Sequence, residues 1–271
     1  MFKILYIYSG NVDPYRDKRF IEEFSQFPDV ELILWNNRTA LVTQQSGSSR
    51  LAADAAITMY SKKWMGELLE TNNIRSFNSV KASFTANNKW ATYQKLRQAN
   101  IPQPKTSLTP DFEFPYICKA TFGSLGNNIK LVTSKDEASP VAVPHIFQEY
   151  IAESAGKSTR VIMVNKKPVA WYSLVNTKSF KSNFSKGGVG HTCTLTPEME
   201  DLCIRTAECL NLDYCGIDLL YSNRGWLVLE VNSKPGLKGI ETFTGINVAK
   251  FFAEHVVNTL RAEKALEVTN D

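Results

Sequence analysis

Long apolar runs are missing from the 271-residue sequence: nowhere do about 18 apolar residues follow one another, as a membrane-spanning helix requires. The apolar stretch from Met1 to Tyr8 is also too short for a signal peptide. The five cysteines are odd in number and form no Cys-x-x-Cys pair. We therefore expect reduced thiols, no membrane association and a cytoplasmic location.

Several common catalytic patterns are absent as well. The three histidines (His145, His191 and His255) show no metal-ligand spacing and have no cysteine partner at a suitable interval. The sequence contains no Gly-x-Ser-x-Gly nucleophile elbow and matches neither the P-loop nor the dinucleotide-binding fingerprint. These absences argue against a zinc site and against a hydrolase built on a nucleophile elbow.

The composition is that of a soluble globular protein, with 43% apolar and 21% charged residues. The formal net charge of +4 is too mild to indicate nucleic acid, although it is compatible with an anionic ligand such as a nucleotide. Aromatic residues are spread over core-like positions and form no stacking platform, so we expect no nucleic-acid partner.

Strands and helices alternate over the first ~80 residues, which predicts a small α/β unit with a largely parallel sheet. Apolar and β-branched runs predict strands, and apolar residues at helical spacing predict helices. The expected strands are Lys3 to Tyr8, Val30 to Trp35 and Ala55 to Tyr60, and the expected helices are Arg19 to Phe27 and Lys62 to Asn72.

The rest of the chain predicts antiparallel pairs and is therefore α+β. The expected strands are Tyr116 to Ala120, Ile129 to Val132, Ile146 to Ile151, Thr159 to Val164, Val169 to Val175, Ile217 to Tyr221 and Trp226 to Val231. The expected helices are Ala86 to Ala99, Pro197 to Leu210 and Asn247 to Leu260. We place a boundary near residue 82.

The hairpin near the end of the chain is the most informative feature. Glu230 and Asn232 are two residues apart, so period-2 alternation places them on one face of their strand. In a simple register, Asp218 on the facing strand can point to the same side. Three hard oxygen donors suit Mg²⁺, although spacing alone leaves a solvated strand face at roughly even odds. The rigid turn from Asn232 to Gly236 favours the metal site.

Two lysines and a glycine loop are further candidates. Lys119 interrupts the apolar strand, where an ammonium is costly unless an anion meets it; a solvent-facing lysine on a sheet edge is the alternative. Lys89 stands at a helix start, where a cation opposes the macrodipole. The loop Thr121 to Asn128 contains Gly123 and Gly126, whose flexibility would allow its N–H groups to approach phosphates, although most such loops are simple turns.

Taken together and in order, these segments resemble the ATP-grasp superfamily, and most of all the branch of the ribosomal protein S6 α-L-glutamate ligase. The resemblance covers about residues 75 to 260. Its matching segments are Asn88-Lys89, Ile117 to Lys119, Gly123 to Ile129, Phe147 to Ile151, Arg160, Phe180 to Asn183, Lys186 to Gly188, Gly216 to Leu220 and Leu229 to Glu241. Each motif is weak alone, but all of them in the right order are specific.

The resemblance implies an ATP-grasp fold with a small N-terminal α/β lobe and two lobes that clasp ATP. The implied divisions are residues 1–82, 83–262 (about 83–150 covering ATP and about 151–262 bearing the metal) and a tail at 263–271. The implied nucleotide contacts are Lys89, Lys119, Gly123, Ser124, Leu125, Gly126, Gln148, Glu149, Tyr150 and Ile151. Arg160, Lys181 and Asn183 are implied as catalytic residues, and Asp218, Glu230 and Asn232 as ligands of Mg²⁺, usually two ions, for which Mn²⁺ can substitute.

The implied activity joins a carboxylate to an amine through an acyl-phosphate, with ATP as phosphoryl donor and a small molecule or peptide as acceptor. Such chemistry depends on positioning and electrostatics, so the lack of a catalytic triad is expected. Members of the family are often homo-oligomers. Two alternatives remain: a nucleotide-binding switch protein without catalysis, and a ligase that acts on a non-peptide small molecule.

Four departures concern the family pattern outside the metal ligands. Ser158 stands where the glutamate ligases have an aspartate that helps hold the ribose, and we keep it as a candidate nucleotide contact. The arginine pair near Ser173 to Val175 is missing, Lys181 replaces an arginine, and Lys234 stands where a small residue is usual. The acceptor side therefore differs, and glutamate addition to a ribosomal protein is not implied.

Overall fold

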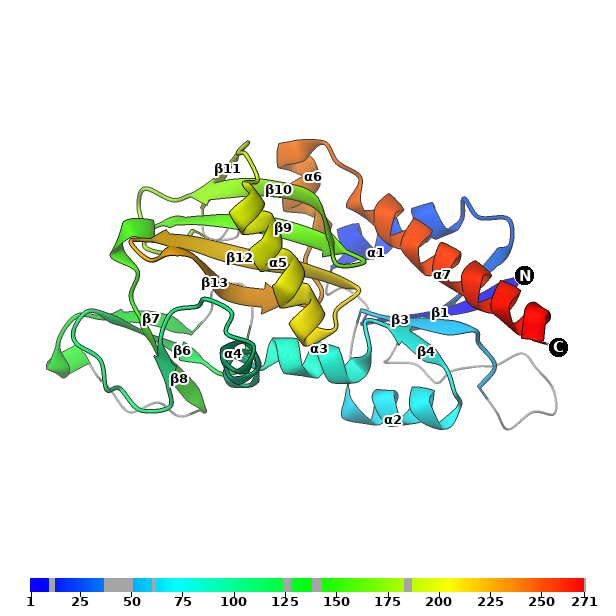
Figure 1. Ribbon diagram of the computed structural model, residues 1–271, viewed down its shortest axis with the longest axis horizontal. Coiled ribbons are helices and arrows are strands. Elements are labelled where there is room, and N and C mark those ends of the chain that lie inside the picture. Colours follow the sequence, from blue (N-terminus) through cyan, green and yellow to red (C-terminus); the bar gives the residue numbers. More distant parts are fainter. Residues whose placement is uncertain are drawn as a thin grey trace.

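The computed structural model describes residues 1–9, 13–36, 51–59, 62–123, 128–137, 143–182 and 187–270. The strands in these residues form three sheets, one parallel and two antiparallel (Figure 1). The α/β start and the α+β remainder predicted from the sequence are therefore both present.

The N-terminal sheet has the strand order β2-β1-β3-β4, and all its pairs are parallel. Its strands are β1 (Phe2–Tyr8), β2 (Val30–Asn36), β3 (Ala55–Thr58) and β4 (Arg75–Phe77). Along β1, Ile4 and Tyr6 pack with α1 (Pro14–Phe24), whereas Leu5 and Ile7 pack with α2 (Lys63–Thr71). Because both faces are covered, Ile4 to Ile7 form an unbroken apolar run instead of alternating with polar residues.

Helix α1 begins five residues earlier than the predicted Arg19 and ends at Phe24. Pro14 occupies the first turn, where its missing N–H costs nothing, and the Asp13 side chain accepts a hydrogen bond from the Arg16 N–H. The Asp13-Pro14 pair is a sequence pattern typical of a helix start, and the prediction from apolar spacing alone missed it.

The helix expected over Ala86 to Ala99 is present as α4 (Lys89–Gln98), but it starts three residues later, because Ala86 and Asn87 end a separate helix, α3 (Val80–Asn87). Asn88 between them has extended backbone angles, and its side chain accepts from the Ala91 N–H as the N-cap of α4. The break points the first residue of α4, Lys89, towards the site described below. The division expected near residue 82 falls inside α3 and stays a prediction.

A small antiparallel sheet follows, in the order β5-β8-β6-β7. Its strands are β5 (Thr106–Ser107), β6 (Tyr116–Ala120), β7 (Ile129–Val132) and β8 (His145–Glu149), and a 3₁₀ turn (Lys135–Glu137) lies between β7 and β8. The predicted hairpin of β6 and β7 is present, with Lys119 paired to Ile129. Of the loop at its tip, residues 124–127 lie outside the described part of the chain.

The largest sheet is antiparallel, in the order β11-β10-β9-β12-β13. Its strands are β9 (Lys157–Val164), β10 (Lys167–Val175), β11 (Val189–His191), β12 (Tyr214–Ser222) and β13 (Gly225–Asn232). One face packs on α5 (Pro197–Leu210) through residues such as Val161 and Met163. The alternate residues of β9, such as Ile162 and Val164, pack with α6 (Leu237–Thr244) and α7 (Val248–Asn270).

Helix α7 continues to Asn270, past the predicted end at Leu260, so residues 263–270 of the expected tail are helical. It lies beside α1 on the N-terminal sheet (Figure 1). Phe252 of α7 is fully buried, with its ring 5.3 Å from that of Phe20 and 5.0 Å from that of Tyr214. One hydrophobic core thus joins the N-terminal sheet to the largest sheet.

The five cysteines are all free, as expected from their pattern, and Cys118, Cys203 and Cys215 are buried. No helix within the described residues has both the length and the apolarity needed to cross a bilayer.

The shared core gives the first prediction. Phe252→Ala should lower the free energy of unfolding by about 3–5 kcal/mol, because it opens a cavity between both sheets. Phe251→Ala is the matched control: Phe251 is 43% exposed, so a change below about 1 kcal/mol is expected. Urea denaturation followed by circular dichroism measures both values. Equal losses for the two variants would contradict this account of the core.

Candidate active site

The two carboxylates of the terminal hairpin are direct cross-strand neighbours. Asp218 of β12 pairs with Glu230 of β13, and Gly216 pairs with Asn232. Directly opposite residues point to the same face of an antiparallel pair, and Asn232 follows Glu230 by two. A bulge after Asp218 leaves Leu229 as an additional residue on β13. The hairpin therefore carries all three oxygen donors on one face.

Each carboxylate is paired with a cation from another part of the chain. Arg160 of β9, in register with Asp218, donates from Nε and Nη2 to the two carboxylate oxygens at 2.7 and 2.6 Å. Burial alone would lower the pKa of Arg160, but the charge of Asp218 and its hydrogen bonds outweigh burial and raise the pKa well above its ordinary value. Lys89 Nζ lies 3.3 Å from Glu230 Oε1 and donates to the Gly123 carbonyl at 2.8 Å.

The donor set fits a divalent cation. Two carboxylates and a carboxamide are the hard oxygen ligands that Mg²⁺ prefers, and both carboxylates already face positive groups. Within the described residues no three His, Cys, Asp or Glu side chains gather as a metal cluster. A metal at this face would therefore need the amide oxygen of Asn232, which accepts from the Lys234 N–H at 3.0 Å.

Lys119 is buried in β6, at 3% exposure. Its ammonium donates to Gln148 Oε1 at 2.8 Å, and Gln148 in turn donates to Thr106 Oγ1 at 2.9 Å. Burial lowers the pKa of Lys119 to about 8, opposed by the negative charge of Glu230 and assisted by the positive charge of Lys89. The solvent-facing alternative considered for this lysine is therefore wrong.

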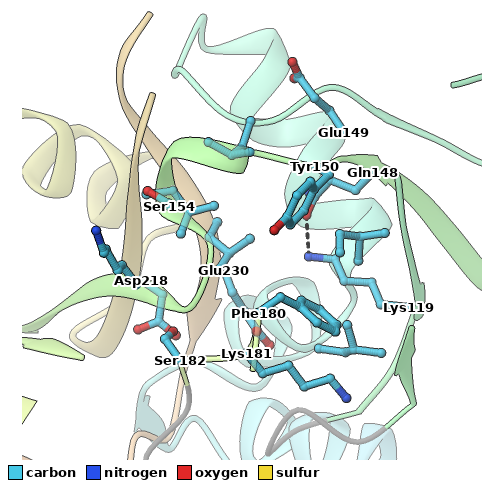
Figure 2. A pocket seen from close by; sticks show the side chains of 16 residues that line it. Lys119, Gln148, Glu149, Tyr150, Ser154, Phe180, Lys181, Ser182, Asp218 and Glu230 are labelled. Atoms are coloured by element: carbon cyan, nitrogen blue, oxygen red, sulfur yellow. Dashed lines mark hydrogen bonds between the residues drawn. The ribbon is translucent and has the colours of Figure 1, made fainter. Parts of the chain in front are cut away.

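A pocket lies between the small sheet and the hairpin, and it encloses about 720 Å³ of space that is partly open to solvent. Figure 2 shows its polar side chains arriving from both sides, with Lys119 opposite Asp218 and Glu230 between them. Eight predicted site residues line it: Lys119, Gln148, Glu149, Tyr150, Ile151, Lys181, Asp218 and Glu230. Lys89 lines a smaller adjoining pocket together with Lys119, Gln148 and Glu230.

The side chain of Glu149 does not point into this pocket. Its carboxylate turns outward (Figure 2) and accepts from Arg224 Nη2 at 2.7 Å and from the Lys105 N–H at 3.0 Å. This residue therefore presents its main chain to the pocket, while its side chain joins the small sheet to the β12–β13 turn.

The remaining predicted residues have different outcomes. Ser158 is buried and shares a 2.7 Å hydrogen bond with the hydroxyl of Ser182, which lines the pocket. Lys181 lines the pocket with Phe180, whose ring lies 5.5 Å from its ammonium. Asn183, Ser124, Leu125 and Gly126 lie outside the described residues.

Several pocket residues were not predicted. Lys157, Ser154, Phe180 and Ser182 all line it. Lys157 starts β9, three residues before Arg160, and period-2 alternation would place the two on opposite faces, so the sequence contained no signal for it. Ser154 belongs to a 3₁₀ turn (Ala152–Ser154) and bonds both the N–H and the carbonyl of Tyr221, a contact over 67 residues for which no sequence pattern exists.

The sequence matches the family model of the RimK-like ATP-grasp domain over residues 86–256. A protein named probable alpha-L-glutamate ligase from Histophilus somni (strain 129Pt) is 31% identical over 204 residues, covering 69% of this chain and 68% of that protein. A ribosomal protein bS6–L-glutamate ligase from Salmonella paratyphi B is 33% identical over 214 residues, covering 72% of this chain and 71% of that protein.

Solved structures show the same fold at lower identity. The ATP-grasp ligase PsnB, in complex with minimal precursor, Mg and ADP, gives a TM-score of 0.72 at 18% identity and covers 95% of this chain and 97% of its own. The D-alanine–D-alanine ligase from Bacillus anthracis gives a TM-score of 0.67 at 15% identity and covers 97% of this chain and all of its own.

The family match extends over more than half of the chain, and it includes every described residue of the site from Lys89 to Asn232. The chain belongs to the RimK-like ATP-grasp family and is an ATP-dependent ligase of the carboxylate–amine class.

Proposed function

We propose that this enzyme forms an amide bond between a carboxylate and the amine of an amino acid or peptide, through an acyl-phosphate made from ATP at the pocket of Figure 2. The observation that carries the proposal is that Lys119, Asp218 and Glu230 line one pocket, while Arg160 and Lys89 each form an ion pair with one of its two carboxylates. Phosphoryl transfer requires such positioned charge and no protein nucleophile.

The pocket offers separate surfaces to the parts of a nucleotide. Ile117, Ile129, Leu220 and Leu229 supply apolar walls for a base, next to the main chain of residues 148–151. Lys119 lines the same pocket and Lys89 the adjoining one, where phosphates would compensate the buried ammonium of Lys119. In this arrangement Ser158 and Ser182 offer hydroxyls, instead of a carboxylate, to the sugar.

Asp218, Glu230 and Asn232 would hold Mg²⁺, in our proposal two ions with Mn²⁺ as a possible substitute. When bound, the metal supplies positive charge that offsets the phosphates. The bidentate bond to Arg160 uses one lone pair on each oxygen of Asp218, so this carboxylate has further lone pairs for a metal. If the bond opens on metal binding, the guanidinium of Arg160 becomes available to an anion beside it.

The reaction then has two steps. An oxygen of the substrate carboxylate attacks the γ-phosphorus, the bond from phosphorus to the β–γ bridging oxygen breaks, and ADP leaves. The amine nitrogen attacks the acyl carbon, the bond from that carbon to the phosphate oxygen breaks, and the amine loses a proton as phosphate departs. Lys119, Lys89 and Arg160 stabilise the negative charge of the transferring group.

The positions that recognise the acceptor substrate in the resembled family are the ones at which this chain differs most. Relatives are named for ribosomal protein bS6, and PsnB was solved with a precursor peptide, which supports an amino-acid or peptide substrate here. However, β10 carries Ser173 and Val175, where the relatives' arginines are expected, and Ser173 pairs with the exposed His191. We therefore propose a peptide-type substrate different from the ribosomal protein.

Turnover with mixed substrates tests this function. We expect the protein, incubated with ATP, Mg²⁺ and pooled amino acids or peptides, to release ADP and phosphate in equal amounts and to form an amide product detectable by mass spectrometry. Nucleotide binding without stimulation by any amine or acid would instead support a switch protein. Stimulation only by non-peptide acids would identify the small-molecule alternative.

The face of the β12–β13 hairpin that carries Asp218, Glu230 and Asn232, which we call the metal face, gives a second prediction. Glu230→Ala should reduce turnover at least a hundredfold, because it removes a metal ligand and the partner of Lys89. Glu208→Ala on the exposed side of α5 is the control and should keep turnover within about twofold. Circular dichroism should show both variants folded. A folded Glu230→Ala enzyme with retained activity would refute the metal assignment.

Lys119 predicts how nucleotide binding depends on pH. Below its pKa of about 8 the ammonium is charged and can bind phosphates, so affinity should fall as pH rises through that value. Calorimetric titration with an ATP analogue, in EDTA and from about pH 7 to 9.5, should show up to roughly tenfold weaker binding per pH unit above 8. The bound phosphates shift this pKa upward.

Lys119→Met should bind nucleotide at least tenfold more weakly and lose this pH dependence. Lys130→Met is the matched control, because Lys130 is an exposed lysine on the neighbouring β7 that donates to the Glu137 carbonyl. It should preserve both the affinity and the pH profile. A pH profile unchanged in Lys119→Met would show that another group is responsible.

A further inference from the structure

The backbone segment that follows the metal face is held by buried side chains. The carbonyls of three successive residues, Ser233, Lys234 and Pro235, accept hydrogen bonds from Asn78 Nδ2 at 3.0 Å, Arg16 Nη1 at 3.4 Å and Tyr214 Oη at 3.0 Å, respectively. These three donors are between 1% and 5% exposed. Asn232 is the last residue of β13, so sheet pairing no longer holds the chain beyond it.

Asn78 has the most complete set of bonds. Its Nδ2 donates to the carbonyls of Tyr214 at 2.7 Å and Ser233 at 3.0 Å, and its Oδ1 accepts from the N–H groups of Asp213 at 2.6 Å and Tyr214 at 2.9 Å. A carboxamide has two donor hydrogens and two acceptor lone pairs, so all four are used. The residue is 4% exposed and lies between β4 and α3.

The four bonds join the two ligand-bearing strands at their ends. Tyr214 begins β12, which carries Asp218, and Ser233 directly follows Asn232 at the end of β13. One side chain from the N-terminal region thus sets the distance between the start of one strand and the end of the other. Groups that orient ligands in this way typically change metal affinity by about 10–100-fold when removed.

We propose that Asn78 is a positioning residue of the ligase: its carboxamide fixes the segment with Asn232 against β12, and so sets the geometry of the metal face. The inference rests on the proposed function, since it takes Asp218 and Asn232 as ligands. A purely structural role would stabilise the fold without acting on the metal in particular. Metal affinity, measured apart from stability, separates these two roles.

Asn78→Asp is the sharpest variant. It preserves size and both acceptor contacts, but it loses both donors and places a carboxylate against the carbonyls of Tyr214 and Ser233. Asn78→Ala, which removes all four bonds without adding charge, is the second variant. Asn72→Ala is the matched control, because Asn72 also bonds through both amide atoms, to the Leu51 N–H and the Leu68 carbonyl, away from the site.

The affinity for Mn²⁺ can be measured without turnover. Mn²⁺ is titrated into protein saturated with a non-hydrolysable ATP analogue, and electron paramagnetic resonance detects the free ion. We expect both Asn78 variants to bind Mn²⁺ at least tenfold more weakly than wild type. Analogue binding in EDTA should stay within about threefold, since Lys119 and residues 148–151 lie on the other side of the pocket. Asn72→Ala should lower the melting temperature but leave Mn²⁺ affinity unchanged.

Two results would overturn the proposal. Either Asn78 variant could bind the analogue and still bind Mn²⁺ within twofold of wild type, which would leave a structural role only. Alternatively, both variants could lose analogue binding in EDTA as well, which would make Asn78 a general requirement of the fold. Wild-type protein that binds Mn²⁺ with the analogue but joins no substrates would refute the proposed function, while the Mn²⁺ affinities would still decide the role of Asn78.

Discussion

Two carboxylates face each other across one pair of strands, and much of the site follows from this unfavourable contact. Asp218 and Glu230 are direct neighbours in the register, where like charges repel, and Asp218 is buried. The fold offsets the repulsion with one cation for each acid: Arg160 for Asp218 and Lys89 for Glu230. A buried pair of this kind adds little net stability, since desolvation consumes most of the attraction. The arrangement is therefore better suited to the ligand binding proposed above than to stabilising the fold.

The two cations come from different parts of the molecule, and this difference connects the site to the architecture. Arg160 lies on β9 beside β12 within a single sheet, so its pairing with Asp218 is fixed by the sheet itself. Lys89 begins α4 and also holds the Gly123 carbonyl beyond β6, so its pairing with Glu230 bridges the hairpin and the small sheet. If phosphates bind at Lys89 as proposed, the change in its contacts would also affect Gly123, which follows β6 in the small sheet.

The sequence predicted features set by short-range periodicity. Glu230 and Asn232 share a face because alternation is local, and the hairpin turn is short enough to bring Asp218 opposite them. The apolar neighbours of Lys119 raised the question of a buried ammonium but left a solvent-facing lysine equally open, and only the structure shows that the side chain is buried. Long-range pairing could not be predicted in the same way: nothing near Arg160 indicates that its strand lies beside β12, and Asn78 reaches contacts 135 to 155 residues away. Chain topology, and not composition, determines such pairs.

The hydrophobic clusters divide the enzyme into a large body and a small sheet that is packed separately. The N-terminal sheet, the largest sheet and α7 share one continuous core, so they should behave as one body. The small sheet has its own minor cluster around Tyr116, Cys118 and Val132. Polar contacts join it to the hairpin, chiefly Glu149 with Arg224 and Lys89 with Gly123 and Glu230. Regions with little shared apolar burial open at low free-energy cost. We therefore expect the small sheet to be the more mobile element, whereas the hydrogen bonds of Asn78 lie within the larger body.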